Sequence, residues 1–300
     1  MTDDKFEACI ISGAIGDAWG SSFENEVLID DSKTFYLGQK TTNPRKWHIT
    51  DDTQLTLATC EVLSENNFTP EKLANKFLEY HQNKKLVGVG SSTLKAILDT
   101  EAGMHWTQVG RIGEFAAGNG AAMRIAPFAF YSTITRENIF EACRITHKND
   151  EAFAGALAVF LSIRAILNNN WNGRNNLFDI IIPELPDTRV KDRLIEINEH
   201  AAVMTILDVA KFGNNGYVVN SVPFAIYCST KILDLGLTKI FQAIIDTGGD
   251  TDTNASIAGQ ISGTLIGLNE MPQELLTKLK DLKEYNWIKE IIDKTKASVH

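Results

Sequence analysis

Small residues recur at every fourth position near the C-terminal end of the chain, at Ala255, Gly259, Gly263 and Gly267. Residues four apart share one face of an α-helix, so these four would form a stripe almost free of side chains. Such a stripe lets a second helix approach closely, a steric argument that holds in a soluble core as well as in a membrane. We therefore expect this helix to be buried against a neighbour, with the residues at its N-terminus rigidly placed.

Apolar residues along the rest of the chain also follow a helical period. Phe153, Leu157 and Leu161 recur at four-residue spacing, directly after the acidic pair Asp150 and Glu151. The period predicts further helices over residues 70–82, 91–98, 191–210, 222–235, 238–245 and 274–280. Alternating strand-like runs are scarce, and no segment has the character of an interdomain linker. We expect an all-α fold in which residues 1–300 form a single compact multi-helix domain.

The overall composition narrows the class of protein. The chain has 300 residues, of which 44% are hydrophobic and 22% charged, as in soluble globular proteins. Its net charge of -9 argues against nucleic acid as a partner. The N-terminus is acidic where a signal peptide is basic, and the richest apolar stretch, residues 153–167, is too short to span a bilayer. We expect a cytoplasmic protein without membrane contact, whose four scattered cysteines are buried thiols.

Two clusters of aspartate and threonine each stand directly before a predicted helix. The first contains Thr50, Asp51, Asp52 and Thr53, and the second runs from residue 246 to residue 254. A single aspartate in such a place is most simply a helix N-cap. One cap needs one side chain, however, and adjacent carboxylates repel one another unless a cation or protons neutralise them. Oxygen ligands without His or Cys suit a hard cation, so the clusters predict a site for Mg²⁺, Mn²⁺ or Ca²⁺.

The second cluster opens like a calcium-binding EF-hand loop, with Asp250, Asp252 and Asn254 at alternate positions. The sixth position of that loop should be Gly and is Ala255, and the twelfth should be Glu and is Ile261. The EF-hand is therefore excluded. The remaining interpretation is that the two clusters come together from opposite ends of the chain around a shared metal site, which would make the protein one domain.

Two glycine-rich segments are candidates for binding an anion. Gly118, Asn119, Gly120, Ala121 and Met123 stand in a segment that ends at Arg124 and opens a predicted helical stretch. It is either a simple loop before a helix or a nest of backbone N–H groups that receives a diphosphate. It matches neither the Rossmann fingerprint nor the P-loop.

The remaining candidates carry weaker signals. The segment that contains Gly90 and Ser91 is a second, weaker candidate for the diphosphate. His147 is an isolated histidine, and such a residue is more often a cap or a satisfied surface group than a ligand. Asp17 could be a buried, hydrogen-bonded carboxylate, and Glu24 matters only if it lies near the metals.

Taken in order along the chain, these motifs resemble the ADP-ribosylglycohydrolase family, the group of dinitrogenase-reductase-activating glycohydrolase and ADP-ribosylarginine hydrolase. The resemblance runs from about Gly13 to Gly267. It comprises Gly13-x-x-Gly16-Asp17-x-x-Gly20-Ser21 followed by Glu24, Thr50-Asp51-Asp52-Thr53, Gly118-Asn119-Gly120-x-x-Met123-Arg124, Thr146-His147, Ser221-Val222-Pro223-Phe224-Ala225, and Gly248-Gly249-Asp250-Thr251-Asp252-Thr253.

The resemblance implies a compact all-α domain with a binuclear Mg²⁺ or Mn²⁺ centre. Thr50, Asp51, Asp52 and Asp252 would hold one metal, and Asp250, Asp252 and Thr253 the other, so that Asp252 bridges the two. Glu24 matches a family glutamate that approaches the second metal. Gly118 to Met123 would hold the diphosphate and the adjoining ribose, and His147 would line the same pocket. Ala121 departs from the family, in which many members have Ser.

The implied reaction is metal-dependent hydrolysis of the bond between ADP-ribose and a side chain of a modified protein, with free ADP-ribose as product. Glu24, Asp51 and Asp52 are the candidate catalytic bases. One alternative is a relative that binds ADP-ribose without cleaving it. A weaker one is a prenyl-diphosphate synthase, whose Asp-Asp-x-x-Asp motif is absent because Leu55 stands three residues after Asp52.

The linkage stays open at this point: arginine, serine, or a bond to nucleic acid or a small molecule. The bacterial type of the resemblance favours ADP-ribosyl-arginine on protein. The segments expected to choose the target are residues 25–46 and 168–187, and they match no known pattern.

Overall fold

The computed structural model describes residues 2–24, 46–65 and 68–299. Helices make up most of this part of the chain, so the all-α prediction is confirmed. The α-helices are α1 (Thr2–Gly20), α2 (Asp51–Ser64), α3 (Pro70–Gln82), α4 (Ser91–Glu101), α5 (Arg136–Arg144), α6 (Asp150–Leu167), α7 (Phe178–Ile181), α8 (Arg189–His200), α9 (Ile206–Ala210), α10 (Val218–Thr230), α11 (Ile232–Leu235), α12 (Leu237–Thr247), α13 (Thr251–Ile266), α14 (Gln273–Lys280) and α15 (Tyr285–Lys296).

Short elements connect these helices. The 3₁₀ turns are η1 (Glu114–Ala116), η2 (Asn119–Ala121), η3 (Ala126–Phe130), η4 (Ile182–Glu184) and η5 (Leu268–Glu270). The strands β1 (Arg111–Ile112) and β2 (His147–Lys148) pair in parallel, with Arg111 opposite His147.

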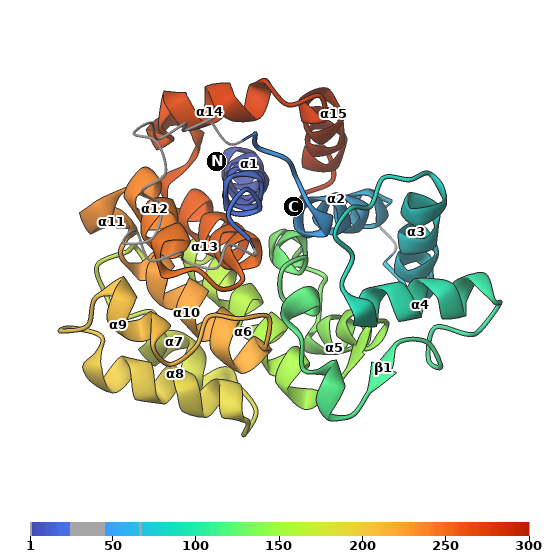
Figure 1. Ribbon diagram of the computed structural model, residues 1–300, viewed down its shortest axis with the longest axis horizontal. Coiled ribbons are helices and arrows are strands. Elements are labelled where there is room, and N and C mark those ends of the chain that lie inside the picture. The colour runs from blue at the N-terminus through green and yellow to red at the C-terminus, as the bar shows by residue number, and fades with distance from the viewer. Residues whose placement is uncertain (1, 25–45, 66–67, 300) are drawn as a thin grey trace, which may run out of the picture.

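Helices α1 and α13 lie side by side at the centre of the molecule (Figure 1). A Cβ added at Gly259 would lie 2.4 Å from the carbonyl oxygen of Ser12, and one at Gly263 would lie 2.4 Å from that of Ala8. Glycines of α1 make the same kind of contact in return: a Cβ at Gly16 would lie 2.2 Å from the carbonyl oxygen of Ala255. The two backbones therefore touch, and the close-packing interpretation of the stripe is confirmed.

Gly267 has a different role from the rest of the stripe. It follows the last residue of α13 with φ 74°, and a Cβ at this position would meet no atom within 4 Å. Because L-residues rarely adopt a positive φ, Gly267 ends the helix and contributes nothing to the contact with α1.

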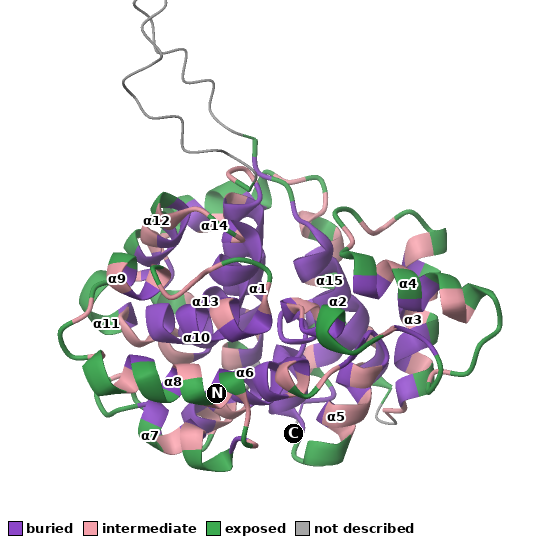
Figure 2. Cartoon of the chain, turned by 60° about the horizontal axis from the view of Figure 1, so that its bottom comes forward, coloured by how far each residue is buried: buried purple, intermediate pink, exposed green. Residues whose placement is uncertain are grey.

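The other helices surround this central pair. Helices α2 to α5 lie on one side of it and α6 to α12 on the other, while α14 and α15 cross one end (Figure 1). The central helices are buried all round, whereas outer helices such as α8 expose one face (Figure 2). All four cysteines are free and buried, as expected. Within the described residues, no helix is both long enough and apolar enough to cross a membrane.

Several helix boundaries differ from the sequence-based predictions. The helix expected over residues 191–210 is divided into α8 and α9, because Thr205 and Asp208 form a capping box that begins a new helix. The helix expected over residues 222–235 is likewise divided into α10 and α11, and α10 begins four residues early. Pro223 consequently lies inside α10 and not at its start.

The segment after Gly118 does not form the expected α-helix. It makes two 3₁₀ turns, η2 and η3, which are separated at Ala122–Ile125. Gly118 and Gly120 have low helix propensity, and Pro127 stands in the first turn of η3, so no long helix is favoured here.

Candidate active site

The first aspartate cluster is held in place by Asp17 of α1. Thr50 caps α2, and its backbone N–H donates to Asp17 Oδ2 at 3.0 Å, while its hydroxyl donates to Oδ1 at 2.8 Å. The backbone N–H of Thr53 also donates to Oδ2, at 3.1 Å, and the Thr53 hydroxyl donates to the same oxygen. Asp17 is fully buried. Its carboxylate therefore fixes the first turn of α2, and with it the directions of Asp51 and Asp52.

The second cluster follows a turn that only glycine allows. Gly248 and Gly249 have φ 65° and 80°, and a Cβ at Gly249 would lie 2.4 Å from Asn214 Oδ1. The side-chain N–H groups of Asn214 donate to the carbonyl oxygens of Thr247 and Gly248, and its own carbonyl oxygen accepts from the backbone N–H of Asp250. Asn214 thus holds the turn that leads into α13.

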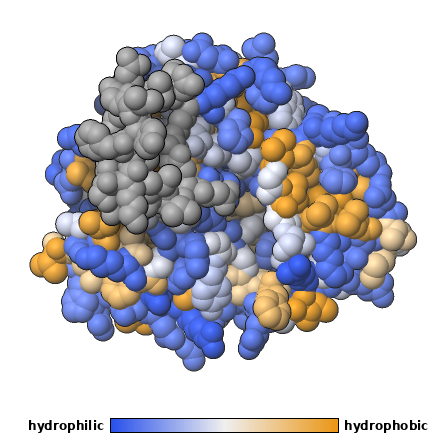
Figure 3. Space-filling model, in the orientation of Figure 1, coloured by the Kyte–Doolittle hydropathy of each residue, from blue (hydrophilic) through white to orange (hydrophobic). Residues whose placement is uncertain are grey.

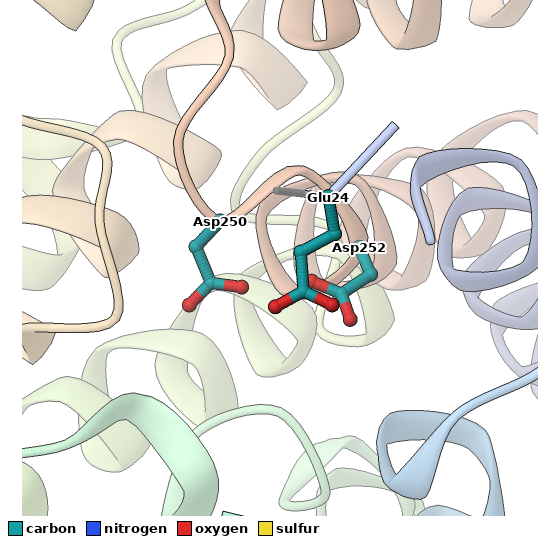
Figure 4. Close-up of side chains that lie close together, drawn as sticks. All are labelled: Glu24, Asp250 and Asp252. Atoms are coloured by element: carbon teal, nitrogen blue, oxygen red, sulfur yellow. The ribbon is translucent and has the colours of Figure 1, made fainter. Parts of the chain in front are cut away.

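The structure brings the two clusters together. The Thr253 hydroxyl donates to Asp52 Oδ2 at 3.1 Å across 201 residues of sequence. The carboxylates of Glu24, Asp250 and Asp252 point toward one another (Figure 4), with one oxygen of each within 4.8 Å of the others. Glu24 stands just after α1, whose last residue, Gly20, touches Thr251 at the start of α13. The packing of α1 on α13 therefore brings Glu24 to the second cluster.

We call Glu24, Asp51, Asp52, Asp250 and Asp252 the acidic wall. Burial, together with neighbouring carboxylates, raises the pKa of Asp51 to about 8 and that of Asp252 to about 10. The pKa of Asp52 is raised in the same way, first by burial and then by Asp252. Glu24, although exposed, also has a raised pKa, from burial of part of its surface and from Asp250. The negative charges of the acidic wall would therefore lack compensation unless a cation or protons neutralised them.

A divalent cation fits this arrangement. Among the described residues, no Lys, Arg or His forms an ion pair with any member of the acidic wall. Asp52 Oδ1 is completely buried and has no hydrogen-bond partner in this part of the chain, although a buried polar atom is normally satisfied. Carboxylate and hydroxyl oxygens without nitrogen or sulfur are the donor set of a hard cation.

The acidic wall forms one side of a cavity of about 290 Å³. Predicted residues from six separate segments meet there. The cavity is lined by Glu24, Thr50, Asp51, Asp52, Gly88, Gly90, Ser91, Ser92, Thr93, Phe115, Gly118, Asn119, Gly120, Met123, His147, Gly216, Asp250, Asp252 and Thr253. Gly90 also contacts the acidic wall directly, because its backbone N–H donates to Asp51 Oδ2 at 3.4 Å.

A second part of the cavity lining, which we call the glycine wall, consists of Gly118, Gly120 and His147. A Cβ at Gly118 would lie 3.1 Å from His147 Nε2, and one at Gly120 would lie 2.9 Å from His147 Cε1. These glycines are thus required by the histidine ring that packs on them. His147 itself is buried in β2 and is no surface group, contrary to the simpler interpretation of the sequence. Burial, together with Arg124 and Arg111, lowers its pKa to about 3, so the ring is neutral.

Asn119 connects the two walls. Its side-chain N–H donates to Asp250 Oδ2 at 2.8 Å. Its backbone N–H donates to the carbonyl oxygen of Gly216, so this N–H is not free to bind an anion. The backbone N–H groups of Ala122 and Met123 donate to the carbonyl oxygen of Asn119, so the nest of N–H groups expected over residues 118–124 is reduced by three. Gly216 also lies against the acidic wall, since a Cβ there would be 3.2 Å from Asp250 Oδ2.

Of the predicted site residues, Ala121 alone does not line the cavity; it is fully buried behind it. The sequence interpretation missed Phe115 and Gly216. Phe115 is 86% exposed at the cavity rim, and an aromatic residue just before the glycine motif was its only signal.

The segments expected to choose the target are only partly visible. Residues 25–45 lie outside the described part of the chain. Residues 168–187 do not reach the cavity. Hydrophobic residues instead gather on the α3–α4 side of the face seen in Figure 3, and the connection between these helices includes the exposed Val87 beside cavity-lining Gly88.

Comparison with known proteins agrees with this geometry. The family model described as ADP-ribosylglycohydrolase matches residues 1–299. A protein of Archaeoglobus fulgidus is 29% identical, covering 93% of this chain and 97% of its own. Human ADP-ribosylhydrolase ARH3 is 22% identical, covering 90% and 87%, and ADP-ribosylarginine hydrolase Tri1 of Pseudomonas putida is 22% identical, covering 92% and 74%.

A solved structure described as an ADP-ribosylglycohydrolase-related protein complex has the same fold. The two chains superpose with a TM-score of 0.67 at 20% identity, and the match covers 100% of this chain and 99% of the other.

Proposed function

The chain belongs to the ADP-ribosylglycohydrolase family, and from this premise we propose that it removes ADP-ribose from arginine side chains of modified proteins. That it is a hydrolase of ADP-ribose linkages follows from the family and from its named relatives. Arginine as the modified residue is the finer part of the proposal. It is supported by the relative named ADP-ribosylarginine hydrolase Tri1 and by one feature of the cavity, the exposed carboxylate of Glu24.

The carboxylate of Glu24 would interact differently with the two possible leaving groups, a charged guanidinium and an uncharged serine oxygen. Asp51, Asp52 and Asp252 are buried, whereas Glu24 is exposed and lines the same cavity. A guanidinium attached to the ribose would approach this carboxylate as a cation, and a carboxylate pairs with a guanidinium through two parallel hydrogen bonds. A serine oxygen has no charge to be recognised in this way. The arginine linkage therefore gains most from the position of Glu24.

The acidic wall would hold the metal ions. We assign Thr50, Asp51, Asp52 and Asp252 to one ion, and Asp250, Asp252 and Thr253 to the other. When bound, two divalent cations supply Lewis acidity toward the ribose hydroxyls and the attacking water. The threonine hydroxyls, which donate to Asp17 and Asp52 in the described structure, would turn a lone pair toward the ion.

The chain's own residues would then position the substrate and move the protons. Gly118, Gly120 and Met123, with Gly90 and Ser91 opposite, would enclose the diphosphate and the adjoining ribose. Asn119 would keep this loop in register with Asp250. Glu24, Asp51 and Asp52 are the carboxylates placed to accept a proton from the water, and the leaving guanidine takes one in return.

The decisive experiment measures free ADP-ribose released from two substrates, one arginine-ADP-ribosylated and one serine-ADP-ribosylated. Each is incubated with the protein in Mg²⁺, in Mn²⁺ and in chelator. Metal-dependent release from the arginine substrate alone is the expected result. Release from the serine substrate alone would reassign the linkage. If neither is cleaved while ADP-ribose still binds in a metal-dependent way, the arginine proposal is wrong, and the chain either binds ADP-ribose without cleaving it or acts on another linkage.

A further inference from the structure

The two ring nitrogens of His147 have different surroundings, one in the buried core and one at the glycine wall. Its Nδ1 lies 2.7 Å from the Thr146 hydroxyl oxygen in the buried interior. Its Nε2 lies next to Gly118 and Gly120, which line the cavity together with His147. Within the described part of the chain, no hydrogen bond reaches Nε2. A neutral imidazole carries its proton on only one of these nitrogens, and the buried side decides which.

The buried side contains a group that can only donate. Arg124 Nη2 lies 2.8 Å from the Thr146 hydroxyl oxygen and also donates to the carbonyl oxygen of Ala142. Arg124 is fully buried, and although burial lowers its pKa to about 10, the guanidinium stays protonated at neutral pH. The Thr146 hydroxyl must therefore accept a hydrogen bond from Arg124.

That contact leaves the Thr146 hydroxyl proton with one available acceptor among the described residues, which is His147 Nδ1. If Nδ1 carried the proton instead, the Thr146 hydroxyl proton would be buried without an acceptor. Leaving a buried donor unsatisfied is costly, so the arrangement Arg124 to Thr146 to His147 is favoured over its reverse. The direction of each hydrogen bond follows from the one before it.

We propose that Thr146 and Arg124 are positioning residues that keep the proton of His147 on Nε2, which makes the ring a hydrogen-bond donor to an oxygen of ADP-ribose bound over Gly118 and Gly120. The ligand contact rests on the proposed function, whereas the direction of the relay does not. An N–H donor at this place can form a hydrogen bond to an anionic or hydroxyl oxygen of the ligand. It cannot form one to a ligand group that is itself only a donor. The glycine wall would thus recognise the ligand through a neutral ring.

The test compares Thr146→Val, which keeps the shape and removes the hydroxyl, with Thr146→Ser, which keeps the hydroxyl. Two-bond ¹H–¹⁵N correlation spectra of the histidine rings report which nitrogen is protonated, and His147→Asn identifies the signal among six histidines. Calorimetry measures ADP-ribose affinity, and Mn²⁺ affinity is measured in parallel. Thr295→Val is a matched control, because Thr295 is equally buried, its hydroxyl donates to the carbonyl oxygen of Ile291, and it lies far from the cavity residues in sequence.

We expect the parent, Thr146→Ser and Thr295→Val to show the proton on Nε2. In Thr146→Val the tautomer should become mixed and ADP-ribose affinity should fall about tenfold, with Mn²⁺ affinity unchanged. A parent with the proton on Nδ1, or a Thr146→Val variant with unchanged tautomer and affinity, would overturn the relay. If the parent does not bind ADP-ribose, the ligand contact and the proposed function both fail, and the spectra still decide the relay.

Discussion

The two walls line the same cavity but are built in different ways. The acidic wall stands on the N-termini of the long helices α2 and α13, and α1 fixes both through Asp17 and through its backbone contact with α13. The glycine wall stands on 3₁₀ turns and on a two-residue strand. Its rigidity comes from the buried Arg124 and Thr146 behind it. The acidic wall is thus supported by long helices, and the glycine wall by a buried hydrogen-bond relay.

Because of this difference, we expect substitutions in the two walls to impair different properties of the protein. Damage to the acidic wall should remove metal binding and catalysis while the fold persists, because helix packing does not depend on the carboxylates. Damage to the glycine wall should weaken ligand binding by smaller factors, because each residue there contributes one contact. The following variants test this contrast.

The largest effect is expected for Asp252→Asn. Asp252 is shared by the two proposed ions, and removing its charge should lower kcat/KM by on the order of a thousandfold or more. Asp246→Asn is the matched control, since Asp246 belongs to the same stretch of sequence but is exposed on α12 and bonds to Gln242. Circular dichroism checks that both variants fold. Full activity of Asp252→Asn with metal still bound would refute the assignment.

A smaller loss is expected for Asp17→Asn. Four donors from Thr50 and Thr53 converge on the two carboxylate oxygens, and an amide would present an N–H group to some of them. Residues that orient metal ligands typically contribute 10–100-fold in affinity, so Mn²⁺ affinity should fall by about that range. Titration followed by electron paramagnetic resonance of free Mn²⁺ measures it. An unchanged affinity would mean that α2 places its aspartates without Asp17.

Gly120→Ala should weaken ADP-ribose binding about tenfold without affecting Mn²⁺ affinity, because the new Cβ would lie 2.9 Å from His147 Cε1 and displace the ring. Calorimetry measures both affinities. Gly90→Ala is the comparison, since its Cβ would meet no protein atom within 4 Å. Any loss of affinity in Gly90→Ala therefore reports a contact with the ligand itself. If Gly120→Ala and Gly90→Ala lowered Mn²⁺ affinity by equal factors, the two walls would not have the separate roles that we assign to them.

The neutral state of His147 should appear in the dependence of stability on pH. Its pKa is about 3 in the folded chain against an ordinary value of 6.5, so the unfolded state binds the proton more readily between these values. Stability due to this group is therefore present above pH 6.5 and is lost as pH falls. From pH 6.5 to 5.5 the loss should be about 1 kcal/mol. Urea unfolding in chelator should show this loss as the difference between the parent and His147→Asn, because the aspartates of the acidic wall titrate in both chains and cancel.

Ala121→Ser should have the smallest effect on the ligand. Ala121 is fully buried and does not line the cavity, so a hydroxyl there cannot touch ADP-ribose. We expect a change of less than about twofold in affinity and a destabilisation of about 1 kcal/mol from burying a hydroxyl. A large gain in affinity would show that the turn moves when the ligand binds.

The acidic wall was the more predictable of the two from sequence. Paired aspartates at helix starts and small residues every fourth position are local patterns with a direct physical meaning. They indicated that the two aspartate clusters would lie together and that α13 would pack closely on another helix, as the structure has them. The identity of the helix that packs on α13 was not indicated, because no local pattern tells which of several helices will contact it.

The glycine wall was less predictable because its order comes from contacts distant in sequence. The motif at Gly118 indicated a binding loop, but it also suggested a helix that does not form. His147 looked like an isolated residue, since its partners Arg124 and Gly118 are more than twenty residues away. Phe115 and Gly216 belong to no chemical motif at all. Their place at the cavity follows only from the folded chain.

The contact between Gly20 and Thr251 also determines when, during synthesis of the chain, the acidic wall can be completed. The Thr251 hydroxyl donates to the carbonyl oxygen of Gly20 at 2.8 Å, across 231 residues. During synthesis α1 leaves the ribosome first, and the helix that packs against its glycines is among the last to follow. A nascent chain that carries Asp51 and Asp52 still lacks Asp250 and Asp252. The proposed metal site can therefore form only after the start of α13 has been made, and metal binding would report that α1, α2 and α13 have come together.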